Sequence, residues 1–227
     1  MLLHGSSDIV SFSGAGLSAE SGLDTFRDAE GVWARYDPAV YASVKGFERD
    51  PDGVSEWYQQ RRRSYAGARP NPAHVALAGR PMRHVTQNID TLLELAGADD
   101  VIHLHGAIDR DRCHGGCGHL EAVDPANPPG LRPCPICGAA MRPDVVWFGE
   151  LLPETEWSAA LRAIAGADVL LVIGTSAEVW PAAGLIHTAS DAGIPIVVVN
   201  VEPGTAQGIA TYELVGQAGE IVPALLR

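Results

Sequence analysis

The sequence predicts an α/β protein with a Rossmann-like, doubly wound parallel sheet and a smaller domain made of a helical insertion and a zinc-binding module. Three observations predict this fold. Short apolar runs alternate with helical segments, which is typical of parallel strands that helices cover on both faces. A glycine-rich turn follows the first apolar run. Two close pairs of cysteines interrupt the alternation in the middle of the chain.

The first predicted strand covers residues 8–13 (DIVSFS) and ends in the turn GAGLSA, which has the pattern G-x-G-x-x-A. Such a turn places backbone N–H groups and the start of a helix against a diphosphate. We therefore expect Gly14, Ala15 and Gly16 to bind a dinucleotide. The acidic residue that dehydrogenases carry about 20 residues later has no clear candidate here, so hydride transfer is disfavoured.

The other elements continue the alternation around two interruptions. Residues 28–69 are polar and aromatic without a strand-like run, which predicts a helical insertion, and a helix capped by Asn71 follows over 71–78. Further strands are expected at 84–86, 101–104, 144–148, 168–173 and 194–199, and further helices at 90–96, 154–165 and 181–191. The predicted domains are residues 1–28, 70–106 and 144–227 for dinucleotide binding, and residues 29–69 and 107–143 for the small domain.

Polar residues follow several of these strands, at the edge of the sheet where ligands bind in such folds. They are Gln87, Asn88 and Asp90, then His105, then Gly174, Thr175 and Ser176, and finally Asn200 and Glu202. An imidazole at this edge, with a pKa near neutrality, can serve as a base. Each position also has a structural interpretation: His105 as a packed core residue, Asn88 or Asp90 as a helix cap, and Asn200 as part of a turn.

The four cysteines have the spacing of a metal site. Three residues separate Cys113 from Cys117, sixteen separate the two pairs, and two separate Cys134 from Cys137. Two such knuckles supply the four tetrahedral ligands that zinc prefers, and four thiolates leave no open position for water. We therefore expect one structural zinc ion. The alternatives are two disulfides, four ordinary thiols, or a nearby histidine in place of one sulfur.

The charge balance disfavours nucleic acid as a partner. The 227 residues include 16 Lys and Arg against 28 Asp and Glu, a formal net charge of −12, so no broad phosphate-binding surface is expected. No apolar run reaches the roughly 18 residues of a membrane span, and the first residues lack a basic region followed by an apolar stretch. We expect a cytoplasmic protein with no membrane partner.

In combination, these motifs resemble those of the sirtuins, which are NAD-dependent protein-lysine deacylases. The resemblance covers essentially the whole chain. It lies in GAGLSAESG (14–22), TFR (25–27), TQNID (86–90), HG (105–106), the four cysteines, VVWFGE (145–150), GTS (174–176) and NVE (200–202). It implies that NAD is consumed as a co-substrate, that acylated-lysine proteins are the partners, and that nicotinamide and O-acyl-ADP-ribose are released.

The resemblance also implies a role for each site residue. Arg27 would neutralise diphosphate charge, Asn88 and Asp90 would contact the nicotinamide carboxamide, and Gln87 would contact its ribose. His105 would activate a ribose hydroxyl as general base. Asn200 and Glu202 would bind the adenosine ribose. The acyl-lysine tunnel would have Val146, Phe148 and Val179 as apolar walls, and the segment from Val146 through Gly149 to Glu150 would pair with a substrate peptide as an added strand.

One part of the insertion is similar to the class III branch of the family, which is associated with acidic acyl groups. Tyr58 and Arg61 are three residues apart, so on a helix they share a face and could both reach a carboxylate at the tip of a succinyl or malonyl group. The alternative is that Arg61, Arg62 and Arg63 form a solvated basic face over a packed Tyr58.

Three other functions remain compatible with parts of the sequence. A noncatalytic module that binds NAD or ADP-ribose would need the glycine turn but not His105. A zinc-ribbon adaptor would need only the cysteines. A mono-ADP-ribosyltransferase would share nicotinamide release and differ in the acceptor. The presence of His105 beside the complete set of motifs favours the deacylase.

Overall fold

The computed structural model describes residues 8–25, 31–206 and 208–227. Its main element is a six-stranded sheet, parallel throughout, with the strand order β3-β2-β1-β7-β8-β9. The strands are β1 (Ile9–Ser13), β2 (Arg83–Thr86), β3 (Val101–His103), β7 (Val169–Ile173), β8 (Ile196–Asn200) and β9 (Tyr212–Val215). From β1 the chain adds β2 and β3 on one side of the sheet, and it then adds β7, β8 and β9 on the other side of β1. This order confirms the predicted doubly wound sheet.

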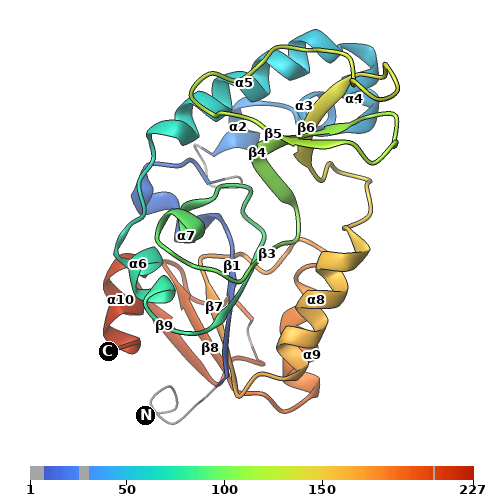
Figure 1. Ribbon diagram of the computed structural model, residues 1–227. Coiled ribbons are helices and arrows are strands. Elements are labelled where there is room, and N and C mark those ends of the chain that lie inside the picture. The colour runs from blue at the N-terminus through green and yellow to red at the C-terminus, as the bar shows by residue number, and fades with distance from the viewer. Residues whose placement is uncertain (1–7, 26–30, 207) are drawn as a thin grey trace.

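Helices cover both faces of this sheet (Figure 1). In β7, Leu170 and Val172 pack toward α8 and α9, whereas Leu171 and Ile173 pack toward the opposite helices. This alternation follows from the two-residue period of a strand. The helices are α8 (Glu154–Ala165) and α9 (Gly184–Asp191) on one face, and α6 (Pro72–Ala78), α7 (Leu92–Leu95) and α10 (Ala218–Leu225) on the other.

A second body lies beyond the carboxyl ends of the parallel strands, at the top of Figure 1. Among the described residues, it joins helices α2 to α5 with a three-stranded antiparallel sheet of order β5-β4-β6. The elements are α2 (Val32–Arg35), α3 (Pro38–Tyr41), α4 (Val44–Arg49), α5 (Pro51–Gly67), β4 (Gly106–Cys113), β5 (Leu120–Ala122) and β6 (Met141–Val145). Val32, Phe47 and Trp57 from the helices share one core with Ile108 and Trp147. The insertion and the cysteine segment therefore form one packed unit.

A buried ion pair ties α5 to β4. Arg62 and Asp111 are almost fully buried, and the Arg62 guanidinium lies 2.6 Å from the Asp111 carboxylate. Arg62 Nε also donates to the carbonyl of Ile108 at 2.6 Å, and Arg132 donates to the second Asp111 oxygen at 2.6 Å. Both charges are thus matched within hydrogen-bond distance, which buried charges require.

The prediction of a helix directly after the glycine turn is wrong. Two short 3-10 turns, η1 (Ala15–Leu17) and η2 (Ala19–Ser21), replace it. Side chains take carbonyls that an α-helix would use: Asn88 Nδ2 donates to Gly14 O at 3.1 Å, and Asn71 Nδ2 donates to Leu17 O at 2.8 Å. A diphosphate at this turn therefore gains nothing from an α-helix dipole.

Other differences concern the second sheet, the edge strand β9 and two helices. The strand expected at 144–148 is β6 at Met141–Val145, and it lies in the antiparallel sheet. Strands β4, β5 and β9 were not predicted, because β4 reads GAIDRDRC and β9 is an exposed edge strand. Helix α10 was not predicted. Helix α9 begins at Gly184, whereas the sequence predicted a start at residue 181. In the described parts of the chain, no helix combines the length and the apolar character needed to cross a membrane. The exact domain boundaries remain a prediction.

Candidate active site

A cavity of about 830 Å³ opens at the carboxyl ends of β1, β7 and β8, below the second body. This volume lies within the range of about 300–1,000 Å³ that is typical of ligand sites. Most of the predicted site residues line it. They are Gly14, Ala15, Gly16, Tyr58, Arg61, Gln87, Asn88, His105, Val146, Phe148, Gly149, Glu150, Gly174, Thr175, Ser176, Val179, Asn200 and Glu202. Arg27 lies outside the described residues.

The glycine turn packs directly against the loop after β7. The N–H of Gly14 donates to Ile173 O at 3.0 Å, and the N–H of Gly16 donates to Gly174 O at 2.8 Å. A Cβ atom at Gly16 would stand 2.7 Å from Gly174 Cα, which is too close for any side chain. The sequence analysis expected the N–H groups of these glycines to bind a diphosphate. In the structure the N–H groups of Gly14 and Gly16 instead bind the carbonyls of Ile173 and Gly174, so they are not available to a diphosphate.

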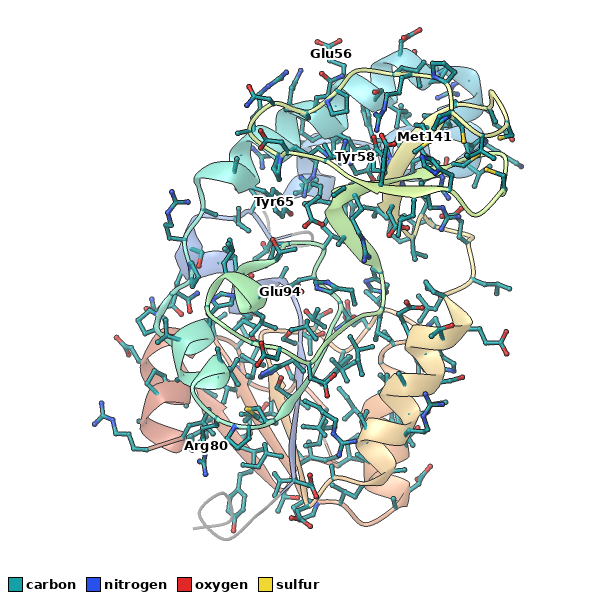
Figure 2. The ribbon with its side chains drawn as sticks, in the orientation of Figure 1. Glu56, Tyr58, Tyr65, Arg80, Glu94 and Met141 are labelled. Carbon is teal, nitrogen blue, oxygen red and sulfur yellow. The ribbon has the colours of Figure 1, made fainter. Side chains whose placement is uncertain are left out.

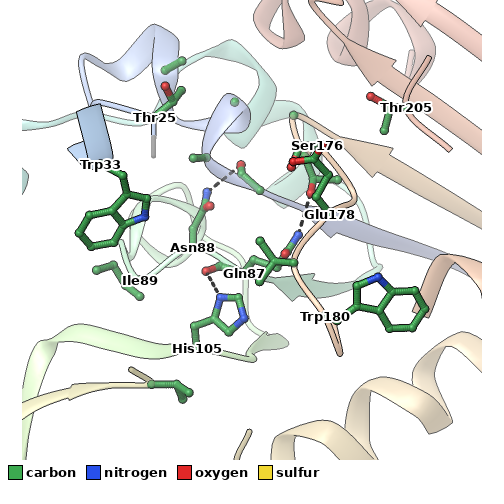
Figure 3. A pocket seen from close by; sticks show the side chains of 18 of the residues that line it. Thr25, Trp33, Gln87, Asn88, Ile89, His105, Ser176, Glu178, Trp180 and Thr205 are labelled. Carbon is green, nitrogen blue, oxygen red and sulfur yellow. Dashed lines mark hydrogen bonds between the residues drawn. The ribbon is translucent and has the colours of Figure 1, made fainter. Parts of the chain in front are cut away.

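His105 is oriented as a base. Its Nδ1 lies 2.9 Å from the carbonyl oxygen of Gln87 (Figure 3). Because a carbonyl oxygen can only accept, Nδ1 carries the proton in the neutral imidazole, and Nε2 keeps its lone pair. Burial lowers the pKa of His105, and the bond to Gln87 O opposes that shift in part. The ring is therefore held in the tautomer that a general base needs.

His103, two residues earlier in the chain, cannot act in this way. Its Nδ1 lies 3.0 Å from Asn88 O, and its Nε2 lies 2.6 Å from a carboxylate oxygen of Glu94. Both ring nitrogens are thus engaged. Burial lowers the pKa of His103, but Glu94 outweighs this effect and the net pKa is raised. The hydrogen bonds distinguish a candidate base, His105, from a structural histidine.

A buried polar network holds the loop after β2. Asn88 Nδ2 donates to Ser18 Oγ at 3.2 Å, and Ser18 Oγ donates to Asp90 Oδ2 at 2.9 Å. Asp90 Oδ1 accepts the N–H of Leu92 at 3.1 Å, so the capping interpretation is partly realised. Asp90 does not line the main cavity but borders a small adjoining pocket with Ser18 and Asn88. Burial raises the pKa of Asp90.

The residues after β7 and β8 are held against each other. Gln87 Nε2 donates to Thr175 Oγ1 at 2.9 Å. Asn200 Nδ2 donates to the carbonyl of Thr175 at 3.1 Å and to Thr205 Oγ1 at 2.7 Å. The amide of Asn200 thus joins two loops, as expected for its structural interpretation, whereas Glu202 is exposed at the border of the cavity.

The segment 146–150 forms another wall of the cavity. The side chain of Phe148 is 52% exposed. The N–H groups of Val146 and Phe148 donate to the carbonyls of His105 and Ala42, both at 2.9 Å, and the N–H of Trp147 donates to Glu150 Oε2 at 2.8 Å. These three N–H groups are therefore not available to pair with a peptide strand.

The two residues of the candidate acyl site both lie on α5 and border the cavity. Tyr58 is almost fully buried, and it lies in the second body, near the top of Figure 2. The Arg61 guanidinium lies 4.9 Å from the ring centroid of Trp57 and 5.5 Å from that of Tyr65, and it donates to the Tyr65 hydroxyl at 3.0 Å. The alternative of a continuous solvated basic face is wrong, because Arg62 is buried against β4 and only Arg63 of the three arginines is exposed.

Sequence reasoning missed the tryptophan side chains that line the cavity. Trp33, Trp57, Trp147 and Trp180 all line it. Trp33 and Trp180 stand on opposite sides of His105 in Figure 3. Trp180 is 66% exposed and stacks on His187 with a centroid distance of 5.7 Å. The aromatic content of the insertion was the available signal for Trp33 and Trp57, but no spacing rule connects those residues to the cavity.

The four cysteines come together outside the residues that line the cavity. The sulfur atoms of Cys113, Cys117, Cys134 and Cys137 all lie within 4.8 Å of one another. The sulfur atoms of Cys113 and Cys137 are 3.4 Å apart, and those of Cys117 and Cys134 are 3.6 Å apart. A tetrahedral zinc ion with bonds of about 2.3 Å to sulfur needs sulfur atoms about 3.8 Å apart, so this arrangement fits zinc. Sulfur–sulfur bonds would require about 2.0 Å, which excludes disulfides here.

The comparisons with known proteins agree with one another. Residues 14–181 match the model of the Sir2 family. A relative from Pseudomonas aeruginosa, named NAD-dependent protein deacylase 1, is 46% identical over 240 residues, which cover 100% of this chain and 96% of the relative. NAD-dependent protein deacylase 2 of Pyrobaculum aerophilum is 44% identical, with 99% of this chain and 92% of the relative covered.

Solved structures of similar proteins contain related ligands. A complex of a Sir2 homologue mutant with ADP ribose has a TM-score of 0.95 at 40% identity, covering 100% of this chain and 93% of that one. A mutant complex with 2'-O-acetyl ADP ribose has a TM-score of 0.91 at 42% identity, covering 99% and 92%. A complex of Sir2 with a p53 peptide and NAD+ has a TM-score of 0.85 at 29% identity, covering 99% and 94%.

Proposed function

Because this chain belongs to the Sir2 family, we propose that it removes acyl groups from lysine side chains of proteins in an NAD-dependent reaction. The relatives that match it along nearly their whole length are named NAD-dependent protein deacylases. The observation that carries the proposal is the hydrogen bond from His105 Nδ1 to Gln87 O, which leaves Nε2 as a base at the cavity. NAD binding alone would not require that arrangement.

NAD, as co-substrate, supplies a ribose carbon that loses nicotinamide and accepts the acyl oxygen. The residues around the cavity bind the parts of NAD and transfer the proton. Ala15 and the loop Gly174–Ser176 are the candidate neighbours of the diphosphate, and Glu202 is the candidate partner of the adenosine ribose. His105 takes the proton from a ribose hydroxyl. Asn88 and Asp90, held by Ser18, are the candidate contacts of the nicotinamide carboxamide.

The reaction products test this function directly. The enzyme is incubated with NAD and with otherwise identical peptides that carry acetyl-, succinyl- or malonyl-lysine, and the products are analysed by mass spectrometry. We expect free lysine in the peptide, nicotinamide, and O-acyl-ADP-ribose in equal amounts. ADP-ribose attached to the peptide would indicate a mono-ADP-ribosyltransferase instead. Absence of NAD turnover with every peptide would indicate a noncatalytic binding module.

The pH dependence should report the state of His105. Burial lowers its pKa below the usual 6.5, and the neutral imidazole is the active base. We expect kcat/KM to be independent of this group above that pKa and to fall about tenfold per pH unit below it. The measurement is a pH profile at saturating NAD. An acidic limb with its midpoint clearly above 6.5 would contradict the assignment, as would the same limb in His105→Ala.

We also propose that the acyl site accepts succinyl and malonyl groups as well as acetyl. The support is the position of a phenol and a guanidinium together at the cavity border, on one face of α5. Trp57 and Tyr65 hold the Arg61 guanidinium in place, so little side-chain entropy remains to be lost when a carboxylate binds. Val146, Phe148 and Val179 are the candidate walls for the lysine methylenes. A cytoplasmic location remains a prediction of the sequence.

Replacement of Arg61 should lower kcat/KM for acidic acyl groups more than for acetyl. A charge-assisted hydrogen bond contributes about 1.5–3 kcal/mol, so Arg61→Met should lower kcat/KM for a succinyl peptide about tenfold to a hundredfold. The acetyl peptide carries no carboxylate and should change much less. Arg63→Met, at an exposed position on the same helix, is the matched control and should leave both rates near the parent values. Equal losses on both peptides would remove the specificity proposal while the deacylase function stands.

A further inference from the structure

The indole of Trp147 is fixed from two sides. Its Nε1–H donates to the hydroxyl oxygen of Tyr58 at 2.9 Å. On its face, the Arg142 guanidinium lies 3.9 Å from the ring centroid, and Glu150 binds that guanidinium in turn. Trp147 and Tyr58 are both almost fully buried. The ring therefore cannot rotate without losing its hydrogen bond and its contact with a buried cation.

The bond from Trp147 determines what the Tyr58 hydroxyl can offer. A phenol has one proton to donate, and its oxygen accepts. Here the oxygen accepts from Trp147, and no described residue accepts the phenol proton in return. Tyr58 lines the cavity, so that proton is left for a ligand. Burial raises the pKa of Tyr58 to about 12, which keeps the proton in place at neutral pH.

We propose that Trp147 is a positioning residue for acyl choice: its indole N–H holds the Tyr58 hydroxyl as a donor toward the charged end of an acidic acyl group. The inference rests on the proposed acceptance of succinyl and malonyl groups. It adds a residue outside the Tyr58 and Arg61 pair and a reason why the phenol donates. An acetyl group ends in a methyl, which accepts no hydrogen bond, so the contribution of Trp147 is confined to acidic groups.

The first test is Trp147→Phe, which keeps an aromatic ring beside Arg142 and removes the indole N–H. We expect kcat/KM for the succinyl peptide to fall about fivefold, the factor that corresponds to one neutral hydrogen bond. The loss should lie in KM, with kcat nearly unchanged. The acetyl peptide should stay within about twofold. Trp157→Phe, on α8 and away from the cavity lining, is the control for the loss of an indole.

A double substitution tests whether Trp147 acts through Tyr58. In a Tyr58→Phe background the acceptor is already gone, so adding Trp147→Phe should cause no further loss on the succinyl peptide. A full additional fivefold loss would overturn the inference. Equal losses on the acetyl and succinyl peptides would overturn it as well, because they would indicate a packing defect in the cavity wall.

A spectroscopic measurement tests the hydrogen bond without relying on activity. In protein labelled with 15N-tryptophan, the Trp147 indole N–H signal is assigned from its disappearance in Trp147→Phe. It should move upfield in Tyr58→Phe, while the other indole signals stay in place. An unchanged Trp147 signal would overturn the inference at its premise. If the parent enzyme removes no acidic acyl group, the acyl-site proposal and this inference fail together, whereas the deacylase function is judged by the acetyl peptide.

Discussion

His105→Ala should abolish most of the deacylation and leave the fold and NAD binding largely intact. The loss of a positioned general base typically lowers the rate about a hundredfold to ten-thousandfold. The effect should fall on kcat, because His105 acts after the diphosphate and riboses are bound by other residues. Steady-state kinetics with an acetyl peptide, calorimetric titration with NAD and a thermal melt give the three readouts.

His103→Ala is the matched control for this substitution. It removes an imidazole two residues away whose nitrogens are both engaged, by Asn88 O and by Glu94. We expect a loss of at most about tenfold, because that side chain can position the loop but has no lone pair to act as base. Deacylation at the parent rate by an NAD-binding His105→Ala enzyme would show that another group is the base.

Removal of one cysteine should destabilise the second body. We expect the parent to carry one zinc ion per chain and Cys113→Ser to lose it. Zinc binding in small zinc domains contributes on the order of 10 kcal/mol. Even part of that energy would lower the melting temperature of a chain of this size by about 10 °C or more. Metal analysis and thermal melts by circular dichroism measure both effects.

His119→Ala controls for the alternative in which a histidine replaces a sulfur. His119 is in contact with Glu121, 3.1 Å away, and we expect its substitution to leave the zinc content unchanged. Carefully prepared, folded parent protein with far less than one zinc per chain would contradict the assignment. So would a Cys113→Ser variant that retains both its metal and its melting temperature.

The sequence predicts those parts of the fold that the local pattern of side chains determines. The strand around Leu170 is wholly apolar because both faces are covered, and its neighbours could be identified in the same way. Strand β4 was missed because its stability depends on distant partners: Asp111 is buried only because Arg62 and Arg132 reach it from elsewhere in the chain. No pattern within residues 106–113 carries that information.

The same limit applies to the site. The residues at the sheet edge could be predicted because they directly follow the expected parallel strands, and His105 could therefore be identified as a candidate base. Its tautomer could not, because the carbonyl of Gln87 determines it. For the glycine turn, the sequence analysis correctly identified that glycines are needed, but it gave the wrong physical reason for them. Gly16 is required by the backbone of Gly174, which approaches from 158 positions further along the chain.

The shared core of the second body constrains the order in which the chain can fold. The hydrogen bond between Tyr58 and Trp147 joins residues 89 positions apart, and Trp57 is buried in the same core. During synthesis from the N-terminus, helices α2 to α5 therefore emerge before their core is complete, because Val145 and Trp147 are the last members of that core to be made. By then all four cysteines have emerged. Metal capture and completion of the acyl site thus belong to the same late stage of folding.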